Sequence, residues 1–209
     1  MAGVVLSDGQ LRDEIITPLV DTLDLVNGGA FGGANGLSNA FFPFFRAGGG
    51  GRQISQYNVP GGGPTLPYQT SFLCQGLGFL ALNSYTSNSN SLLPIISDKS
   101  SLNLVIGTKP YLSVPVREVS GSVYVSGTAA TTVAATTINQ FIQSYGLPEA
   151  KPMMFDRNHN IPIAPQQNWE IDWQVEQLSA AEIAATTVAA AAPVRLSALM
   201  YGLLRRPVQ

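Results

Sequence analysis

The residues that could perform acid–base chemistry are few and lie mainly in the last third of the chain. Glu170 and Asp172 are two positions apart in a segment that alternates between apolar and polar residues. In a β-strand, which rises about 3.3 Å per residue, their side chains would share a face about 7 Å apart. This is near the separation that glycosidases use for paired carboxylates. Because Asn168, Gln174 and Glu176 share that face, solvent or a polar interface explains it better, and we predict no catalytic residue here.

The other motifs for catalysis or metal binding are incomplete. His159 is the only histidine, which excludes a histidine-cluster metal site. Residues 156–160 have the spacing of the first three ligands of a calcium loop. However, Ile161 stands where that loop needs its turn glycine, and Gln167 where it needs a bidentate glutamate. We therefore predict a polar turn and no metal.

Glycine-rich stretches at 28–36, 48–51 and 61–63 could suggest a phosphate cradle. The spacing of a dinucleotide-binding fingerprint is absent, and no Gly-Lys pair is available for a phosphate-binding loop. These stretches are predicted to be structural loops. Cys74 is the only cysteine and lies in an apolar stretch, which favours a small buried hydrophobe. The sequence thus predicts no cofactor and no enzymatic activity.

Composition is the stronger functional signal. Hydrophobic residues make up 45% of the chain and charged residues only 11%, against about 25% charged in ordinary soluble domains. Low charge fits a subunit of an assembly, because interface cores are depleted in charged residues, although secreted and adhesive β-proteins share this property. The net charge is −2 and the basic residues are scattered, which argues against sequence-specific nucleic-acid binding. The first residues lack the basic start of a signal peptide, so synthesis in the cytoplasm is expected.

The clearest structural signal is the alternation that includes both tryptophans. It predicts a strand over 168–176 in which Trp169, Ile171 and Trp173 face the core. The apolar run before Pro207 predicts a second long strand over 194–206. Further strands are expected at 52–59, 68–82, 91–97, 102–107, 111–119 and 122–126, between turn-forming residues. This pattern is typical of an antiparallel β-sandwich or barrel, and the length fits a single domain over residues 1–209.

Three segments carry helical signals. Residues 18–27 have apolar positions at three- and four-residue spacing, with Pro18 at a helix start, and residues 1–30 are predicted to form an N-terminal arm or helix. Residues 128–145 end before a glycine suited to a helix C-terminus. Residues 179–192 begin with a capping box, Ser179 to Glu182. The last two segments share the sequence Ala-Ala-Thr-Thr-Val-Ala-Ala and are interpreted as inserts, either helical or extended.

Two groups of residues are candidate subunit contacts. Phe41, Phe42, Phe44 and Phe45 surround a proline that belongs at an edge strand or bend, and their position in core or contact surface stays open. Arg205 and Arg206 end the last strand and could pair with carboxylates or carbonyl oxygens of an adjacent subunit.

The short strands, neutral loops, the strand at 168–175 and the terminal strand at 199–209 resemble the single jelly-roll major capsid proteins of tailless, membrane-containing icosahedral phages. The resemblance covers 38–209 in general character and 166–209 in pattern. It implies an antiparallel jelly-roll sandwich over 38–209 with one or two short helices, and closed cyclic capsomers in a virion. The implied partners are copies of the chain, with a second capsid protein and an internal lipid membrane as further candidates.

The alternative is a jelly-roll carbohydrate-binding module or receptor-binding spike that uses Trp and Tyr faces. The position of the tryptophans distinguishes the two hypotheses. Burial of Trp169 and Trp173 between the sheets favours a shell barrel, whereas exposure in a groove favours sugar binding.

Overall fold

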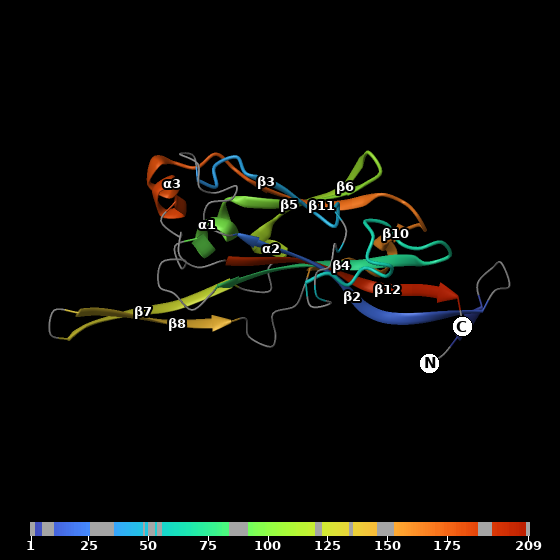
Figure 1. The fold of residues 1–209 in the computed structure, drawn as a ribbon, viewed down its shortest axis with the longest axis horizontal. Helices are drawn as coiled ribbons and strands as arrows, with labels where there is room; N and C mark the ends of the chain where they lie inside the picture. The colour runs from blue at the N-terminus through green and yellow to red at the C-terminus, as the bar shows by residue number, and fades with distance from the viewer. Residues whose placement is uncertain are drawn as a thin grey trace.

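The computed structural model describes residues 3–5, 11–25, 36–47, 49, 53, 56–83, 92–119, 123–133, 136–145, 153–187 and 194–207. Its main body consists of two antiparallel β-sheets packed face to face, with short helices at one end (Figure 1). The predicted all-β sandwich is therefore confirmed.

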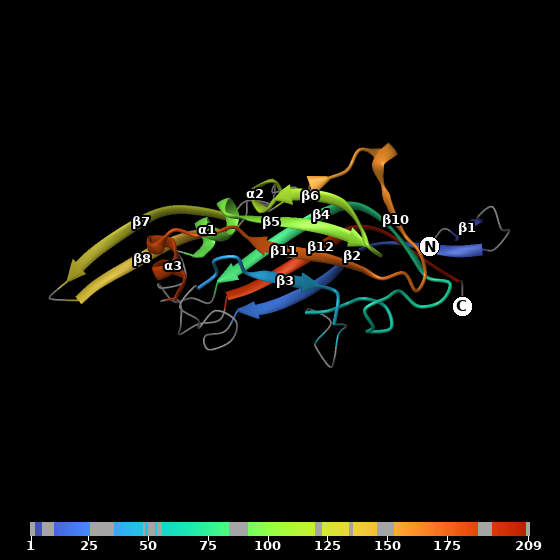
Figure 2. The same ribbon diagram turned by 90° about the horizontal axis from the view of Figure 1, so that it is seen from above.

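Sheet A contains six strands and sheet B contains four (Figure 2). Sheet A has the order β1 (Gly3–Val5), β2 (Leu11–Leu25), β12 (Val194–Pro207), β4 (Ser71–Asn83), β10 (Ile161–Ile163), and β9 (Met153–Met154) also pairs with β4. Sheet B has the order β3 (Phe41–Phe44), β11 (Trp169–Val175), β5 (Ser100–Ile106), β6 (Lys109–Pro115). The predicted strands at 168–176 and 194–206 are thus β11 and β12.

The chain passes between the two sheets in a regular way. The barrel consists of eight strands, which in chain order are β2, β3, β4, β5, β6, β10, β11 and β12. Each connection between consecutive members of this series crosses from one sheet to the other, except that β5 and β6 form a hairpin within sheet B. The result is β2-β12-β4-β10 facing β3-β11-β5-β6, with every pair antiparallel. This arrangement is the eight-stranded jelly roll.

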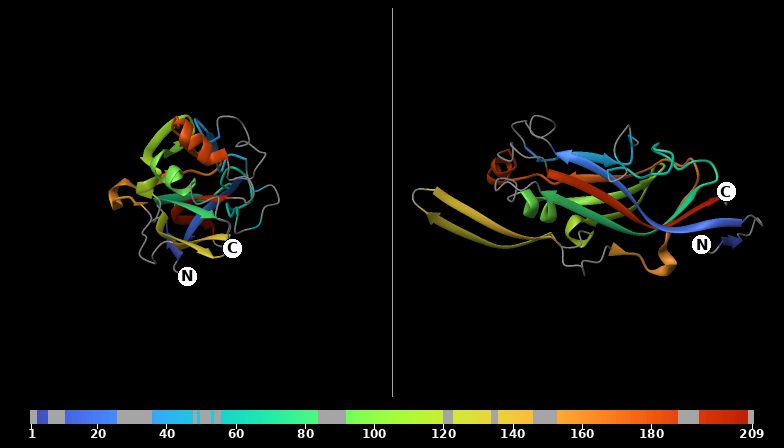
Figure 3. Two further views of the ribbon diagram at one scale, coloured as in Figure 1. Left: turned by 90° about the vertical axis from the view of Figure 1, so that its left-hand side faces the viewer. Right: turned by 60° about the horizontal axis from the view of Figure 1, so that its bottom comes forward.

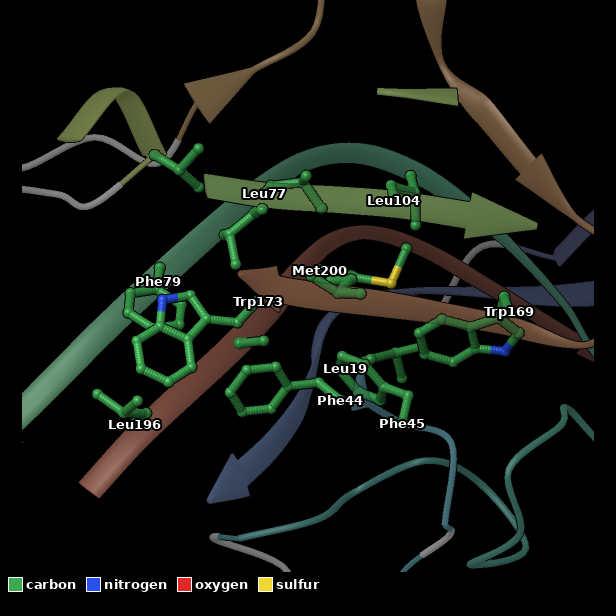
Figure 4. Packing of buried hydrophobic residues seen from close by; sticks show 14 of the residues in the cluster. Leu19, Phe44, Phe45, Leu77, Phe79, Leu104, Trp169, Trp173, Leu196 and Met200 are labelled. Atoms are coloured by element: carbon green, nitrogen blue, oxygen red, sulfur yellow. The ribbon is translucent and has the colours of Figure 1, made fainter. Parts of the chain in front are cut away.

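The core fills the space between the sheets (Figure 4). Trp169, Ile171 and Trp173 all point into it and are at most 3% exposed, which confirms their predicted orientation. Sheet A supplies Leu19, Phe79 and Met200 among others. The alternation of β11 positions its odd-numbered residues inward because successive strand side chains point to opposite faces.

Residues 11–25 form strand β2, so the predicted helix at 18–27 and the predicted N-terminal arm are wrong. β2 pairs with β12 over almost its whole length, from Arg12 opposite Pro207 to Leu25 opposite Val194. Residues on both faces of β2 are apolar, so strand alternation and helical spacing cannot be told apart there. Pro18 is tolerated because its backbone faces away from β12, toward a side of β2 where no regular strand pairs with it among the described residues: its carbonyl oxygen accepts from Asn58 Nδ2 at 2.8 Å, and the nearby Asp21–Tyr57 contact is an isolated bridge.

Other secondary-structure predictions also need correction. The strand expected at 91–97 is helix α1 (Leu92–Asp98), and the end of the strand expected at 111–119 is helix α2 (Val116–Val119). For 128–145, where helical and extended structure were both left open, the structure has the extended alternative, a hairpin of β7 (Val123–Val133) and β8 (Thr136–Tyr145). Part of the strand expected at 52–59 lies outside the described residues, and Tyr57 forms only an isolated bridge with Asp21.

The open choice for 179–192 is decided by helix α3 (Ala180–Thr187). Its capping box is formed: Ser179 N donates to Glu182 Oε2 at 2.8 Å, and Glu182 N donates to Ser179 Oγ at 3.4 Å. The hydrogen bonds from Ser179 lower the pKa of the Glu182 carboxyl.

In the described part of the chain, no helix is long and apolar enough to cross a membrane.

The hairpin of β7 and β8 projects from the barrel at the end opposite β1 (Figure 3). Short helices lie near its base, where α1 contacts β7. Within the described residues, β7 and β8 pair only with each other.

Candidate interaction surface

The two tryptophans offer no exposed ring face for a ligand. Trp173 is fully buried, and its Nε1 donates to Ser100 Oγ at 2.9 Å. Trp169 is 3% exposed and packs on Phe45 with ring centroids 4.4 Å apart. Sugar recognition by stacking needs an accessible aromatic face, and neither indole provides one.

Glu170 and Asp172 lie on the outer face of sheet B beside Arg46. Arg46 Nε is 3.5 Å from Glu170 Oε2, and a pocket of about 290 Å³ lies there. The pocket is lined by Arg46, Pro64, Gly107, Asn168, Trp169 and Glu170. The polar groups of this lining are the Arg46–Glu170 ion pair, the Asn168 amide and the Trp169 indole, with no Ser, Cys or His among them.

Asp172 titrates unusually for a carboxyl group. Burial, together with the negative charge of Glu170, raises its pKa to about 6, while Arg46 opposes the rise. Its Oδ1 is buried and has no hydrogen-bond partner among the described residues. The ionised form is therefore disfavoured by folding.

This shift leads to a prediction for stability against pH. The pKa of Asp172 is higher in the folded chain than the ordinary value of 3.8. The contribution of Asp172 to the free energy of unfolding is therefore fully present below about pH 4 and is lost as the pH rises through about 6. Asp172→Asn should remove this loss and be more stable than the parent at pH 7. Urea unfolding at several pH values between 4 and 7 measures the effect, with Glu176→Gln as an exposed control; parallel curves for parent and Asp172→Asn would contradict the assignment.

The remaining candidates for chemistry are separated from one another. His159 is exposed in the 3₁₀ turn η2 (Arg157–His159), with its Nδ1 3.7 Å from Asp156 Oδ2. Cys74 is fully buried, and desolvation raises the pKa of its thiol to about 12, so it is not a nucleophile. No group of His, Cys, Asp and Glu in the described ranges is arranged to hold a metal ion.

Most of the candidate aromatic contacts belong to the core. Phe44 and Phe45 are at most 2% exposed, so these two are not contact surface. Phe44 points inward opposite the buried Ile171, as the alternation of β3 requires, and Phe45 also enters the core because its backbone is left-handed (φ 69°) where β3 ends. Its N–H donates to Oδ2 of the buried Asp21 at 2.5 Å. Phe42 stacks on Trp173, and Phe41, at 49% exposed, is the member that remains accessible.

Arg205 has a partner within its own chain. Its Nε is 2.6 Å from Glu14 Oε1, and both side chains are partly buried. This pair joins β12 to β2 inside sheet A. The expected contact of Arg205 with an adjacent subunit stays a prediction. Arg206 is exposed next to it, opposite Asp13.

The outer face of sheet A is the most distinctive surface of the barrel. The register of β2, β12 and β4 gives this face an uncharged middle, which we call the uncharged face: Ile16, Pro18, Val20, Thr22, Leu73, Gly76, Gly78, Leu80, Ser197, Leu199, Tyr201 and Leu203. The same register continues the face to the charged residues Glu14 and Arg205 at one end and Arg195 at the other. Thr22, Gly76, Gly78, Ser197 and Leu199 are buried, so the accessible part lies toward Ile16 and Leu80. Ile16 is 85% exposed and Leu80 is 40% exposed. Exposed apolar side chains of this kind on a sheet mark a contact surface when they lie in a charge-free setting.

Glycines give the uncharged face its shape. A Cβ at Gly78 would lie 2.8 Å from the Tyr201 ring, and one at Gly76 would lie 2.5 Å from the Met153 carbonyl oxygen. Tyr201 and β9 can therefore lie close against β4. Met154 in β9 is itself 54% exposed and adds to the apolar surface along this sheet.

The sequence offered no signal for the uncharged face. Ile16 looked like one apolar position of a helix, and only the pairing of β2 with β12 puts it beside Leu203 on an outer surface. A test of residues 11–25 for alternation on both faces could have raised the possibility. No protein-family model matches this chain, and no curated protein matches it at a significant level.

Proposed function

We propose that this chain is a structural subunit of an icosahedral viral capsid that assembles with copies of itself into cyclic capsomers. The observation that carries the proposal is the uncharged face of sheet A on a jelly-roll barrel. A monomer of this composition has little charge to keep it apart from its neighbours, and a net charge of −2 gives poor colloidal stability.

The two outer faces differ in a way that suits a shell. The outer face of sheet B carries Glu170 and Asp172 in the middle of β11, whereas on the outer face of sheet A the charged residues Glu14, Arg205 and Arg195 lie only at the ends of the paired strands, outside the uncharged face. A shell subunit has one surface toward solvent and others toward its neighbours. A symmetric assembly repeats such a contact many times, so each contact can be individually weak.

The burial of both tryptophans supports the shell over the carbohydrate-binding alternative. The described carboxylate pocket places no Ser, Cys or His beside Glu170, and the described residues contain no group of three metal-binding side chains; both observations fit a structural role. Virion location and a second capsid protein or lipid partner belong to the same proposal.

Ile16→Lys tests the uncharged face. Because Ile16 is 85% exposed, the substitution should change the free energy of unfolding by no more than about 0.5 kcal/mol. It should weaken self-association about tenfold or more, because it puts a charge into an apolar contact. Gln174→Lys, which adds the same charge to the outer face of sheet B, is the matched control and should assemble like the parent.

Sedimentation velocity and electron microscopy of the purified protein decide the proposal. The parent should form closed rings or particles in a concentration-dependent manner. A parent that stays monomeric at high micromolar concentration and physiological salt would overturn the capsid proposal, and the binding-module alternative would take its place.

A further inference from the structure

We infer that the hairpin of β7 and β8 is an assembly arm that pairs edge to edge with the hairpin of a second copy of this chain. The inference rests on the proposed self-assembly and names the element that performs it. It comes from the backbone of the hairpin and the sequence that builds it.

The hairpin is long, and the described structure gives it little support. β7 has 11 residues and β8 has 10, so each strand extends about 35 Å at the usual rise. The hairpin projects beyond the barrel in Figures 1 and 2 and in the right-hand view of Figure 3. A two-stranded hairpin standing alone in water is only marginally stable, so a third strand would stabilise it considerably.

Among the described residues, no other strand pairs with either edge of the hairpin. Val133 is opposite Thr136 with two residues between them in the sequence; a hairpin closed in this way has a hydrogen-bonded pair at that position, and non-bonded and bonded pairs then alternate as far as the pair of Thr128 and Phe141. The non-bonded positions therefore direct their N–H and C=O groups away from the partner strand. These positions are 128, 130 and 132 in β7 and 137, 139 and 141 in β8.

The hairpin lacks the features that normally prevent edge pairing. Residues 120–148 contain no Asp, Glu, Lys, Arg or His, and residues 123–145 contain no proline. Natural edge strands are usually protected by charged residues, proline, bulges or short length. Its one irregularity is the register shift between Val125 and Thr128, near the base.

The edge strands of the barrel, in contrast to the hairpin, contain prolines that interrupt pairing. β3 contains Pro43, β6 contains Pro110 and Pro115, β10 contains Pro162, and the free side of β2 contains Pro18. Among the described strands, β7 and β8 therefore have long edges that no proline or charged residue interrupts. An edge of this kind is complementary to a second copy of itself in antiparallel orientation, which gives a two-fold contact.

Two variants test the arm. Replacing residues 124–144 with a short Gly-Ser linker removes it, and the paired positions Val123 and Tyr145 keep the new ends close. Ala130→Pro combined with Asn139→Pro removes one outward donor from each edge and leaves the hairpin's own ladder bonded. Ala180→Pro, at the first residue of α3 where proline is tolerated, is the matched control.

Sedimentation velocity should show the deletion variant as a folded monomer and the double proline variant weakened on the order of tenfold or more in association. The control should assemble like the parent. In the assembled parent, hydrogen exchange should slow at the amides of the six outward positions.

The failures of the two proposals are distinguishable. If the parent assembles and both variants assemble equally well, the arm is overturned and the capsid proposal stands. If the parent does not assemble at any concentration tested, both are overturned. If circular dichroism shows that the deletion variant is unfolded, the double proline variant decides. A folded double proline variant that assembles like the parent overturns the arm, and a folded one that assembles poorly supports it.

Discussion

Trp173→Ala should lower the free energy of unfolding by roughly 3–5 kcal/mol, in the range of large-to-small aromatic substitutions in protein cores. Trp173 is fully buried near the middle of the sandwich (Figure 4). Its ring stacks on Phe42 at 5.6 Å and on Phe79 at 6.3 Å between centroids, so it joins sheet B to sheet A. Removing it leaves a cavity that the surrounding strands can only partly close.

Loss of the indole also breaks a polar connection. Trp173 Nε1 donates to Ser100 Oγ, and Ser100 Oγ in turn donates to the Ile96 carbonyl oxygen of α1. Trp173→Phe keeps most of the ring and loses only the donor. We expect it to cost less than the alanine variant, about 1–3 kcal/mol, because a buried acceptor is left unpaired.

Urea unfolding followed by tryptophan fluorescence and circular dichroism measures both variants. Gln174→Ala, the exposed neighbour on the same strand, should stay within about 0.5 kcal/mol of the parent. A cost below about 1 kcal/mol for Trp173→Ala, or a far-ultraviolet spectrum dominated by helix, would contradict the core described above.

Gly202→Ala should also be strongly destabilising, by roughly 1–3 kcal/mol or more. A methyl group at Gly202 would lie 2.1 Å from the Leu73 carbonyl oxygen and 2.8 Å from Phe72 Cζ. The first of these contacts is with backbone, which cannot rotate away as a flexible side chain can. The strain would fall where the register of β12 and β4 shifts, between Tyr201 and Gly202.

Gly63→Ala is the matched control for this prediction. The nearest atom to a methyl group there is the Thr65 carbonyl oxygen at 3.9 Å, an ordinary contact distance. Its free energy of unfolding should therefore stay close to that of the parent. Equal unfolding midpoints for the two alanine variants would show that β4 can move away from Gly202 and would contradict the close approach of the strands.

The sequence alone was sufficient where local pattern and burial agree. The alternation through Trp169, Ile171 and Trp173 predicted β11 and its inward face, because a strand with one buried face has period two. The capping box at Ser179 and Glu182 marked the start of α3, because both of its hydrogen bonds are local. The lack of a complete catalytic motif was likewise readable from residue types and spacing.

Long-range pairing decided what the sequence left ambiguous. β2 and β7 are strands in segments with helical spacing, because each pairs along its length with another strand and that pairing outweighs local preference. Phe44 is a core residue because β3 pairs with β11 and places it opposite Ile171, and Phe45 because of its left-handed backbone and its hydrogen bond to Asp21, which is 24 residues away in the chain.

The sequence by itself determined that the chain is a charge-poor β-protein with a tryptophan-centred strand, since composition and alternation are local properties. Only the tertiary structure decided which surfaces those residues form. Ile16, Tyr201 and Leu80 share one face because β12 pairs with β2 on one side and β4 on the other. The same register places Arg205 opposite Glu14, and the two side chains form an ion pair. Contacts between residues almost 200 positions apart depend on strand order, and strand order follows from how the whole core packs.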